Sequence, residues 1–209
     1  MPTTALPPTS FHSETLPRNS DWKYLDTGAD PSSEAWTVLG YDDSAWQEGP
    51  GKLGYSDTPN TEIARNGNAA FFRRRFEVEY AARVEKGYIS ALRDDGVVCY
   101  VNGAEIMRDN MPAGAIDINT LASSGVSHGA EVTYTGFLEF DPSVLQDGTN
   151  LVACSVHQSS ATSSDLGFDA EMKMALTIEF TPPEPSATSS PVAAPSPSAS
   201  PAASPAGTD

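Results

Sequence analysis

Basic residues are scarce in this sequence, which has 12 Lys and Arg against 28 Asp and Glu and a formal net charge of −16. A nucleic-acid partner is not expected, because phosphate backbones are bound by basic surfaces. An acidic surface favours solubility, and it can also bind divalent cations.

Long apolar runs are also missing. No stretch approaches the roughly 18 apolar residues that a membrane-spanning helix needs. The first twenty residues do not combine a basic region with a following apolar stretch, so no signal peptide is visible. This pattern predicts a cytosolic chain, or a fragment or mature form of a longer one.

The sequence has two cysteines, Cys99 and Cys154, and both lie inside apolar runs. Without a CxxC pair they make a poor zinc site. Two interpretations stay open. The cysteines are either buried small hydrophobic residues, or they form a disulfide between neighbouring strands.

The composition divides the chain into three regions. Residues 1–20 are polar and predict a loosely ordered lead-in, whereas residues 21–180 hold all the Trp, Tyr and Cys. Residues 181–209 are almost entirely Pro, Ser, Ala and Thr. Such a segment cannot bury a core, so it predicts an extended, disordered linker or tail.

The middle region has the pattern of an all-β domain. Short runs rich in β-branched and aromatic residues alternate with Gly, Asp, Asn and Ser, and no long amphipathic helix occurs. This pattern predicts an antiparallel β-sandwich. The expected strands lie in the runs FFRRRFEVEY, GYISALRDD, GVVCYVNGAEI, EVTYTGFLEFD, NLVACSVHQ and FDAEMKMALTIEF.

Several blocks occur in an order that resembles a known family, the galactose-binding-like jelly-roll modules of large secreted multidomain proteins. The stretch YDDSAWQEG is also similar to the N-terminal sugar-binding domain of the β-galactosidase family. The resemblance covers roughly residues 20–180 and rests on the blocks DWKYLDTGADPSSEAWTVLGYDDSAWQEGPGKLGYSD, FFRRRFEV, LRDDGVVCYVNGAEIMRDNMPAG and DGTNLVACSVHQSSATSSDLGFDAEM.

The resemblance implies a galactose-binding-like jelly-roll fold and an extracellular or cell-surface location. It also implies carbohydrate or cell-surface glycan as ligand, and attachment to other protein domains or chains. The fold itself hosts many binding and purely structural roles.

The adjacent acids Asp94 and Asp95 precede a glycine, and three interpretations apply to them. They are a turn between two strands, or hard oxygen ligands for calcium, or the partner of a buried arginine. The third follows from strand alternation in FFRRRFEV, which places Arg74 on the face of Phe72 and Phe76. The pair also resembles the calcium loop of yeast-adhesin and protective-antigen lectin domains.

The polar stretch 157–169 lies between two expected strands, where binding residues are common. Its candidate ligand-binding residues are His157, Gln158, Ser164 and Asp165. The alternative is a hydrogen-bonded loop anchor. A hydrolase triad is rejected, because the chain has no GxSxG elbow and no loop that would form an oxyanion hole.

The family resemblance also implies a structural calcium site. In such folds an early loop and an acid on the last strand hold the ion, which points to Asp26, Asp30 and Glu171 as metal ligands. The spacing is not that of an EF-hand, and the alternative is an Asx-type turn.

The aromatic residues are expected to be mostly core, including each of the three Trp. Trp46 and Tyr55 are the candidates for a platform on which a sugar ring stacks. Together these features predict a non-catalytic carbohydrate-binding module that tethers or positions an attached partner or surface. The alternative is a structural or interaction sandwich without a sugar site.

Overall fold

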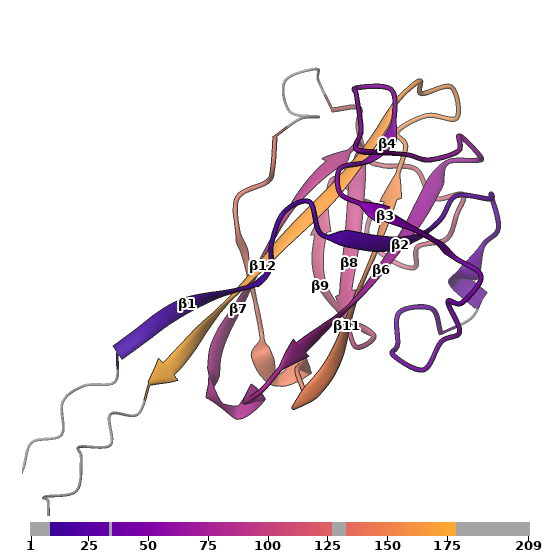
Figure 1. Cartoon of the computed structure of the whole chain (residues 1–209). Coiled ribbons are helices and arrows are strands. Elements are labelled where there is room, and N and C mark those ends of the chain that lie inside the picture. Colours follow the sequence, from indigo (N-terminus) through magenta and orange to yellow (C-terminus); the bar gives the residue numbers. More distant parts are fainter. Residues whose placement is uncertain (1–8, 34, 127–132, 179–209) are drawn as a thin grey trace, which may run out of the picture. The chain divides into compact units, whose positions relative to one another are not determined.

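The computed structural model describes residues 9–33, 35–126 and 133–178. Within them the chain forms two facing β-sheets (Figure 1). The first holds β10 (Leu138–Phe140), β7 (Val84–Asp94), β12 (Leu166–Ile178), β4 (Leu53–Tyr55) and β5 (Thr61–Glu62), with β1 (Thr9–Leu16) also on β12. The second holds β3 (Gln47–Pro50), β2 (Asp21–Leu25), β6 (Ala69–Val78), β11 (Gly148–His157), β8 (Gly96–Val101) and β9 (Ala104–Asp109).

The fold is a jelly-roll β-sandwich, as predicted. From β6 to β8, and again from β10 to β12, successive strands alternate between the two sheets. All ladders between the described strands are antiparallel except the short β4–β5 pair. The helical elements among the described residues are the single turns η1 (Pro31–Ser33), η2 (Ala81–Arg83) and η3 (Pro142–Val144). No helix there is long and apolar enough to cross a membrane.

The lead-in was predicted wrongly in part, because Thr9–Leu16 forms β1 instead of a loose segment. This strand pairs with the end of β12, and Thr9 lies opposite Ile178. The first and last described residues are therefore neighbours. The predicted tail, residues 181–209, lies outside the described residues.

The main core lies between the two sheets, where the Phe72 and Phe168 rings stack with centroids 4.2 Å apart and Trp22 packs edge-on against Phe168. Cys99 and Cys154 are directly paired across β8 and β11, and their sulfur atoms form a disulfide. The interpretation as a disulfide between neighbouring strands is the correct one.

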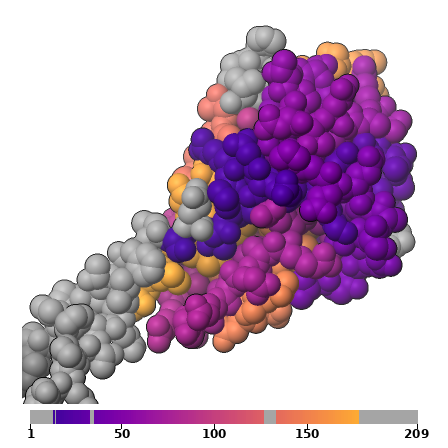
Figure 2. Space-filling view, in the orientation of Figure 1, coloured from indigo at the N-terminus to yellow at the C-terminus, as the bar shows by residue number. Residues whose placement is uncertain are grey.

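A smaller apolar cluster covers the outer face of the second sheet. Trp36 and Trp46 pack there against Phe71 of β6 and Leu151 of β11. In the space-filling view, residues before β7, coloured indigo to purple, cover much of the face turned to the viewer (Figure 2). Because both faces of β11 are covered, this strand has a nearly continuous apolar run, LVACSV. The prediction that each Trp is buried is confirmed.

The buried arginine is Arg73, not Arg74 as alternation suggested. Arg73 is 1% exposed, and its Nε lies 3.0 Å from Oδ2 of Asp43. Arg74 is only half-buried and donates to the main-chain oxygen of Asp21. The prediction failed because the outer face of β6 is covered as well, so the alternation does not identify a solvent face. The Asp94–Asp95 pair is not needed as the partner of a buried arginine.

Candidate functional site

The predicted ligand-binding residues, apart from Trp46, lie at one end of the sandwich. Strand register brings them together, because His157 pairs with Gly96, and β12 begins where Leu166 pairs with Tyr55. The site residues gathered at this end are Tyr55, Asp94, Asp95, His157, Gln158, Ser164 and Asp165. The sequence alone does not show this proximity, because the loops come together only through the pairing of the strands that they connect.

Three carboxylates from different loops converge at this end. Ligand atoms of Asp57, Asp94 and Asp165 all lie within 4.8 Å of one another. Asp94 is buried, whereas Asp57 and Asp165 are partly exposed. Hard oxygen donors of this kind fit calcium, which takes about six to eight oxygens, so main-chain carbonyls or water would complete the shell. Asp57 was not among the predicted residues.

Asp95 has a different role from its neighbour. It is 3% exposed, and its carboxylate accepts from the main-chain N–H of Val126 at 2.6 Å and of Ser159 at 2.7 Å. Burial opposes ionisation, but these hydrogen bonds lower the pKa of Asp95 below its ordinary value. These contacts are those of a side chain that holds two loops together.

His157 and Gln158 are both buried and join separate elements of the fold. His157 is fully buried, with Nδ1 2.9 Å from the Thr120 carbonyl and Nε2 2.9 Å from the Ser155 hydroxyl. Burial lowers its pKa to about 4. Gln158 donates from Nε2 to the Tyr55 hydroxyl at 2.9 Å and to the main-chain oxygen of Asp165. These contacts favour the interpretation as loop anchors.

Ser164 lies on the exposed part of the same loop. Its carbonyl accepts from the Ser56 hydroxyl at 3.0 Å, which ties the β11–β12 loop to the β4–β5 loop.

The two aromatic candidates do not offer a platform. Trp46 and Tyr55 are each 8% exposed. Trp46 packs edge-on against Tyr41, with centroids 5.9 Å apart. A sugar ring needs an open aromatic face, so this part of the prediction is corrected: both rings belong to the packed interior.

The structure does not bring Asp26, Asp30 and Glu171 together as a group of potential metal ligands among the described residues. Asp26 accepts from Gln47 Nε2 at 3.1 Å and from the Ala64 N–H at 2.6 Å. Asp30 accepts from the Ser32 N–H at 2.9 Å, which is the contact of an Asx-type turn.

Glu171, the third of these residues, lies on the outer face of β12 and forms ion pairs. Arg18 donates to it from Nε at 2.9 Å, and Lys173 lies 3.7 Å away. The Arg18 guanidinium also lies 3.8 Å from the centroid of the Tyr134 ring. Tyr134 donates in turn to Asp169, whose pKa is raised by burial.

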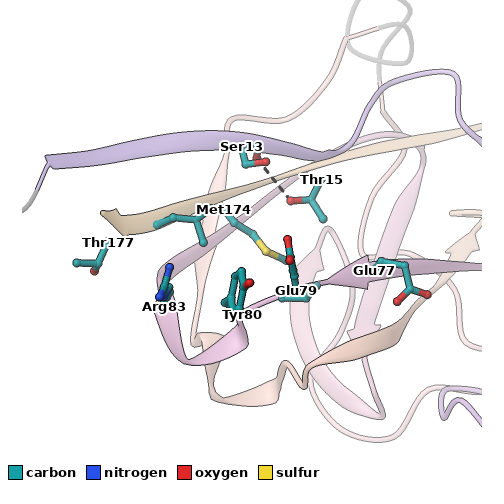
Figure 3. A pocket seen from close by; sticks show the side chains of 10 residues that line it. Ser13, Thr15, Glu77, Glu79, Tyr80, Arg83, Met174 and Thr177 are labelled. Carbon is teal, nitrogen blue, oxygen red and sulfur yellow. Dashed lines mark hydrogen bonds between the residues drawn. The ribbon is translucent and has the colours of Figure 1, made fainter. Parts of the chain in front are cut away.

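A groove of about 470 Å³ opens at the other end of the sandwich, where β6 ends and the β1–β12 ribbon lies alongside (Figure 3). Tyr80 is 52% exposed there. Figure 3 shows Ser13 and Thr15 of β1 on one side, Tyr80 and Glu79 on the other, and Met174 between them. The full lining is Ser13, Thr15, Glu77, Val78, Glu79, Tyr80, Arg83, Met174, Leu176 and Thr177.

The groove was missed because Tyr80 was read as the end of a strand. β6 ends at Val78, so Tyr80 stands beyond the ladder, as the residue before the η2 turn. An aromatic residue after alternating acids, in the stretch EVEY, was the available signal. No strand was predicted before residue 20, so the sequence analysis did not predict that β1 forms one side of the groove.

No protein-family model matches the sequence, and no curated protein matches it. Among solved structures it is similar to a calcium-binding mutant of Bacteroides uniformis β-glucuronidase 2, at 16% identity and TM-score 0.47, over 79% of this chain and 18% of that one. A glycosyl hydrolase family 2 member from Bacteroides cellulosilyticus matches at 14% identity and TM-score 0.49, over 78% and 20%.

The β-glucuronidase of Bifidobacterium dentium, complexed with coumarin-3-O-glucuronide, matches at 15% identity and TM-score 0.43, over 71% and 20%. The chain thus spans about a fifth of the length of these structures. TM-scores below 0.5 do not assign a function. The roles of the groove and of the acidic cluster are therefore inferred from this chain's own residues.

Proposed function

We propose that the chain is a non-catalytic carbohydrate-binding module whose ligand lies in the groove beside Tyr80. The observation that carries the proposal is a half-exposed aromatic ring next to a groove lined by both polar and apolar groups. A pyranose ring has an apolar face of C–H groups and a rim of hydroxyls. It therefore suits an aromatic surface that is surrounded by hydrogen-bonding groups.

The groove supplies these hydrogen-bonding groups from three strands. Ser13 and Thr15 offer hydroxyl groups and Glu79 offers a carboxylate acceptor beside Tyr80 (Figure 3), and hydrogen bonds to a charged acceptor are stronger than neutral ones. Glu77 points away from Tyr80 (Figure 3), and its carboxylate accepts from the Thr149 hydroxyl at 2.6 Å. The Arg83 guanidinium lies 4.7 Å from the centroid of the Tyr80 ring, which helps to hold that ring in place.

A binding role suits these carboxylates better than a catalytic one. A glycosidase needs one carboxyl group that stays protonated near neutral pH, and burial in an apolar site usually provides this. Glu77 and Glu79 are both exposed to water. The function proposed here is therefore recognition without hydrolysis.

Calcium enters the proposal at the opposite end of the sandwich, at Asp57, Asp94 and Asp165. Their close approach from separate loops supports a divalent cation that neutralises the carboxylates and orders the loops.

Addition of calcium should raise the melting temperature of the chain. The double variant Asp57→Asn/Asp165→Asn should lose this response, and Asp117→Asn should keep it. An equal response in all three proteins would contradict the site.

The proposed location is extracellular or at a cell surface, with the tail as a tether. The Cys99–Cys154 disulfide supports this location, because disulfides persist in oxidising compartments. A tethered module gains from high effective concentration, so weak binding at a single groove would be sufficient.

An interaction module without a sugar site is the second candidate, and a specific observation favours it. Phe137 and Leu138 are 43% and 42% exposed, and β10 forms an edge of the first sheet. Exposed apolar groups beside a strand edge are typical of protein contacts.

A glycan array separates the two candidates. The full chain, Tyr80→Ala and the control Phe137→Ala are each screened with calcium and with chelator. Carbohydrate recognition in the groove predicts signals that Tyr80→Ala loses and Phe137→Ala keeps. If the folded chain gives no signal in either condition, the carbohydrate proposal fails for the glycans tested and the interaction module becomes the better account.

A further inference from the structure

A second hollow, of about 220 Å³, concentrates positive charge on the outer side of β6. It is lined by Asp21, Lys23, Glu48, Arg73, Arg74 and Arg75. The chain as a whole has 12 basic residues against 28 acidic ones, so this concentration contrasts with the rest of the sequence. The hollow shares no lining residue with the Tyr80 groove.

The hollow exists because β2 separates from β6. β2 pairs with β6 only where Lys23–Leu25 lie opposite Phe71–Arg73. Beyond Arg73 the two strands are no longer paired, and Arg74 reaches back across the gap to the main-chain oxygen of Asp21. The cationic side chains therefore come from neighbouring strands whose positions the sheet fixes.

One carboxylate holds three of these cations in place. Asp43, 4% exposed, lies 3.0 Å from Lys23 Nζ, 3.0 Å from Arg73 Nε and 3.1 Å from Arg75 Nη1. Burial disfavours the charged carboxylate, but the three cations together keep the pKa of Asp43 below its ordinary value. Together with Asp43, the lining has four basic residues against three carboxylates, so the cluster keeps one net positive charge.

Donors remain for a ligand. The Lys23 and Arg75 side chains are 28% and 43% exposed. The Nε of Arg74 is buried and has no hydrogen-bond partner among the described residues. A buried guanidinium N–H without an acceptor is costly, and arginine binds carboxylate, sulfate and phosphate groups through two parallel N–H donors. The remaining acidic residues, Asp21 and Glu48, are both exposed.

We propose that this hollow binds an oxyanion, namely a carboxylate, sulfate or phosphate group. Arg74 and Arg75 supply the donors, and Asp43 holds Arg75 and Lys23 in position. The proposal does not depend on the carbohydrate groove. It assigns a role to the run RRR. Arg73 is the buried structural member, Arg75 offers its donors from the outer face of β6, and Arg74, on the opposite face, reaches the hollow at the strand edge beside Asp21.

The test is a titration of the full chain with sodium sulfate, sodium phosphate and sodium acetate at constant ionic strength, with chloride as reference. We expect saturable amide shifts at residues 73–75 in NMR spectra, with half-saturation below about 10 mM for one of the anions. Comparison of the three anions identifies the preferred chemistry.

Arg75→Gln and Arg74→Gln should each weaken binding at least tenfold. Lys86→Gln removes one positive charge from the exposed Lys86–Glu139 ion pair of the first sheet and should bind the anion as the unmodified chain does. Arg75 is largely exposed, so its variant tests the proposal even if Arg74→Gln does not fold. The absence of saturable shifts at residues 73–75, or an equal loss in Lys86→Gln, would overturn the proposal.

Discussion

Asp43 and Arg73 form a buried ion pair, with Nε and Oδ2 3.0 Å apart, between the β2–β3 connection and the outer face of β6. Arg73 also donates to the main-chain oxygens of Trp36 and Val38. The pair therefore fixes the long connection that carries Trp36 and Trp46 over the second sheet. Burial of an arginine is acceptable here because both a carboxylate and carbonyl oxygens surround it.

Asp43→Asn should lower the free energy of unfolding by about 3 kcal/mol, because it leaves the Arg73 charge buried without a counter-charge. Urea unfolding followed by tryptophan fluorescence measures this loss. Asp42→Asn is the control, since Asp42 is exposed and its carboxylate accepts from the Ser44 N–H at 3.0 Å. Equal losses of unfolding free energy in the two variants would contradict a stabilising role of the buried ion pair.

Replacement of both cysteines by alanine should lower the free energy of unfolding by about 4 kcal/mol. The disulfide closes a loop over a sequence separation of 55 residues, and its loss restores that freedom to the unfolded chain. Denaturant unfolding of Cys99→Ala/Cys154→Ala measures the change. Reduction of the unmodified chain should have a similar effect. A change below about 1 kcal/mol would contradict a stabilising disulfide.

His157 should make the fold less stable in mild acid. Its pKa falls from 6.5 to about 4 in the folded chain, so the unfolded chain binds a proton in this interval and the folded chain does not. The stabilisation is complete above about pH 6.5 and is lost as the pH falls toward 4. The loss should amount to about 2–3 kcal/mol.

The measurement is the free energy of unfolding between pH 4 and 7 for the chain and for His157→Gln. The variant should be less stable at pH 7 and should show a smaller decrease toward pH 4. Identical pH profiles would show that His157 is not the group responsible. The comparison also removes the contribution of Asp169, whose raised pKa acts in the opposite direction and is common to both proteins.

Apolar runs in the sequence predicted the sandwich, because β6, β7, β11 and β12 are long, largely buried strands of 10 to 13 residues. The hairpin between β8 and β9 was read as one run. Its Asn102–Gly103 turn, with φ of 50° and 90°, is a strong hairpin signal that the sequence already carried. The strand β1 was missed because an edge strand needs few apolar residues.

Most of the residues predicted as ligand-binding lie together at the loop end of the sandwich, but the sequence did not predict their arrangement. Asp94 and Asp165 lie together, yet Asp57 joins them only through the pairing of β4 with β12. Side-chain alternation in β6 could not show which of Arg73 and Arg74 is buried, because segments distant in the sequence pack on both faces of this strand. Tyr80 owes its exposed position to the end of β6 at Val78, and the sequence signals that end only through the alternating acids of EVEY.

The most direct test of the account is the location of bound carbohydrate on the chain. Amide and aromatic NMR signals would be followed as an oligosaccharide selected from the glycan array is added. The account predicts saturable shifts at Tyr80, Glu79 and Thr177, and the loss of these shifts in Tyr80→Ala. Saturable shifts confined to the loop end around Asp57 and Asp165, with Tyr80 unchanged, would contradict it.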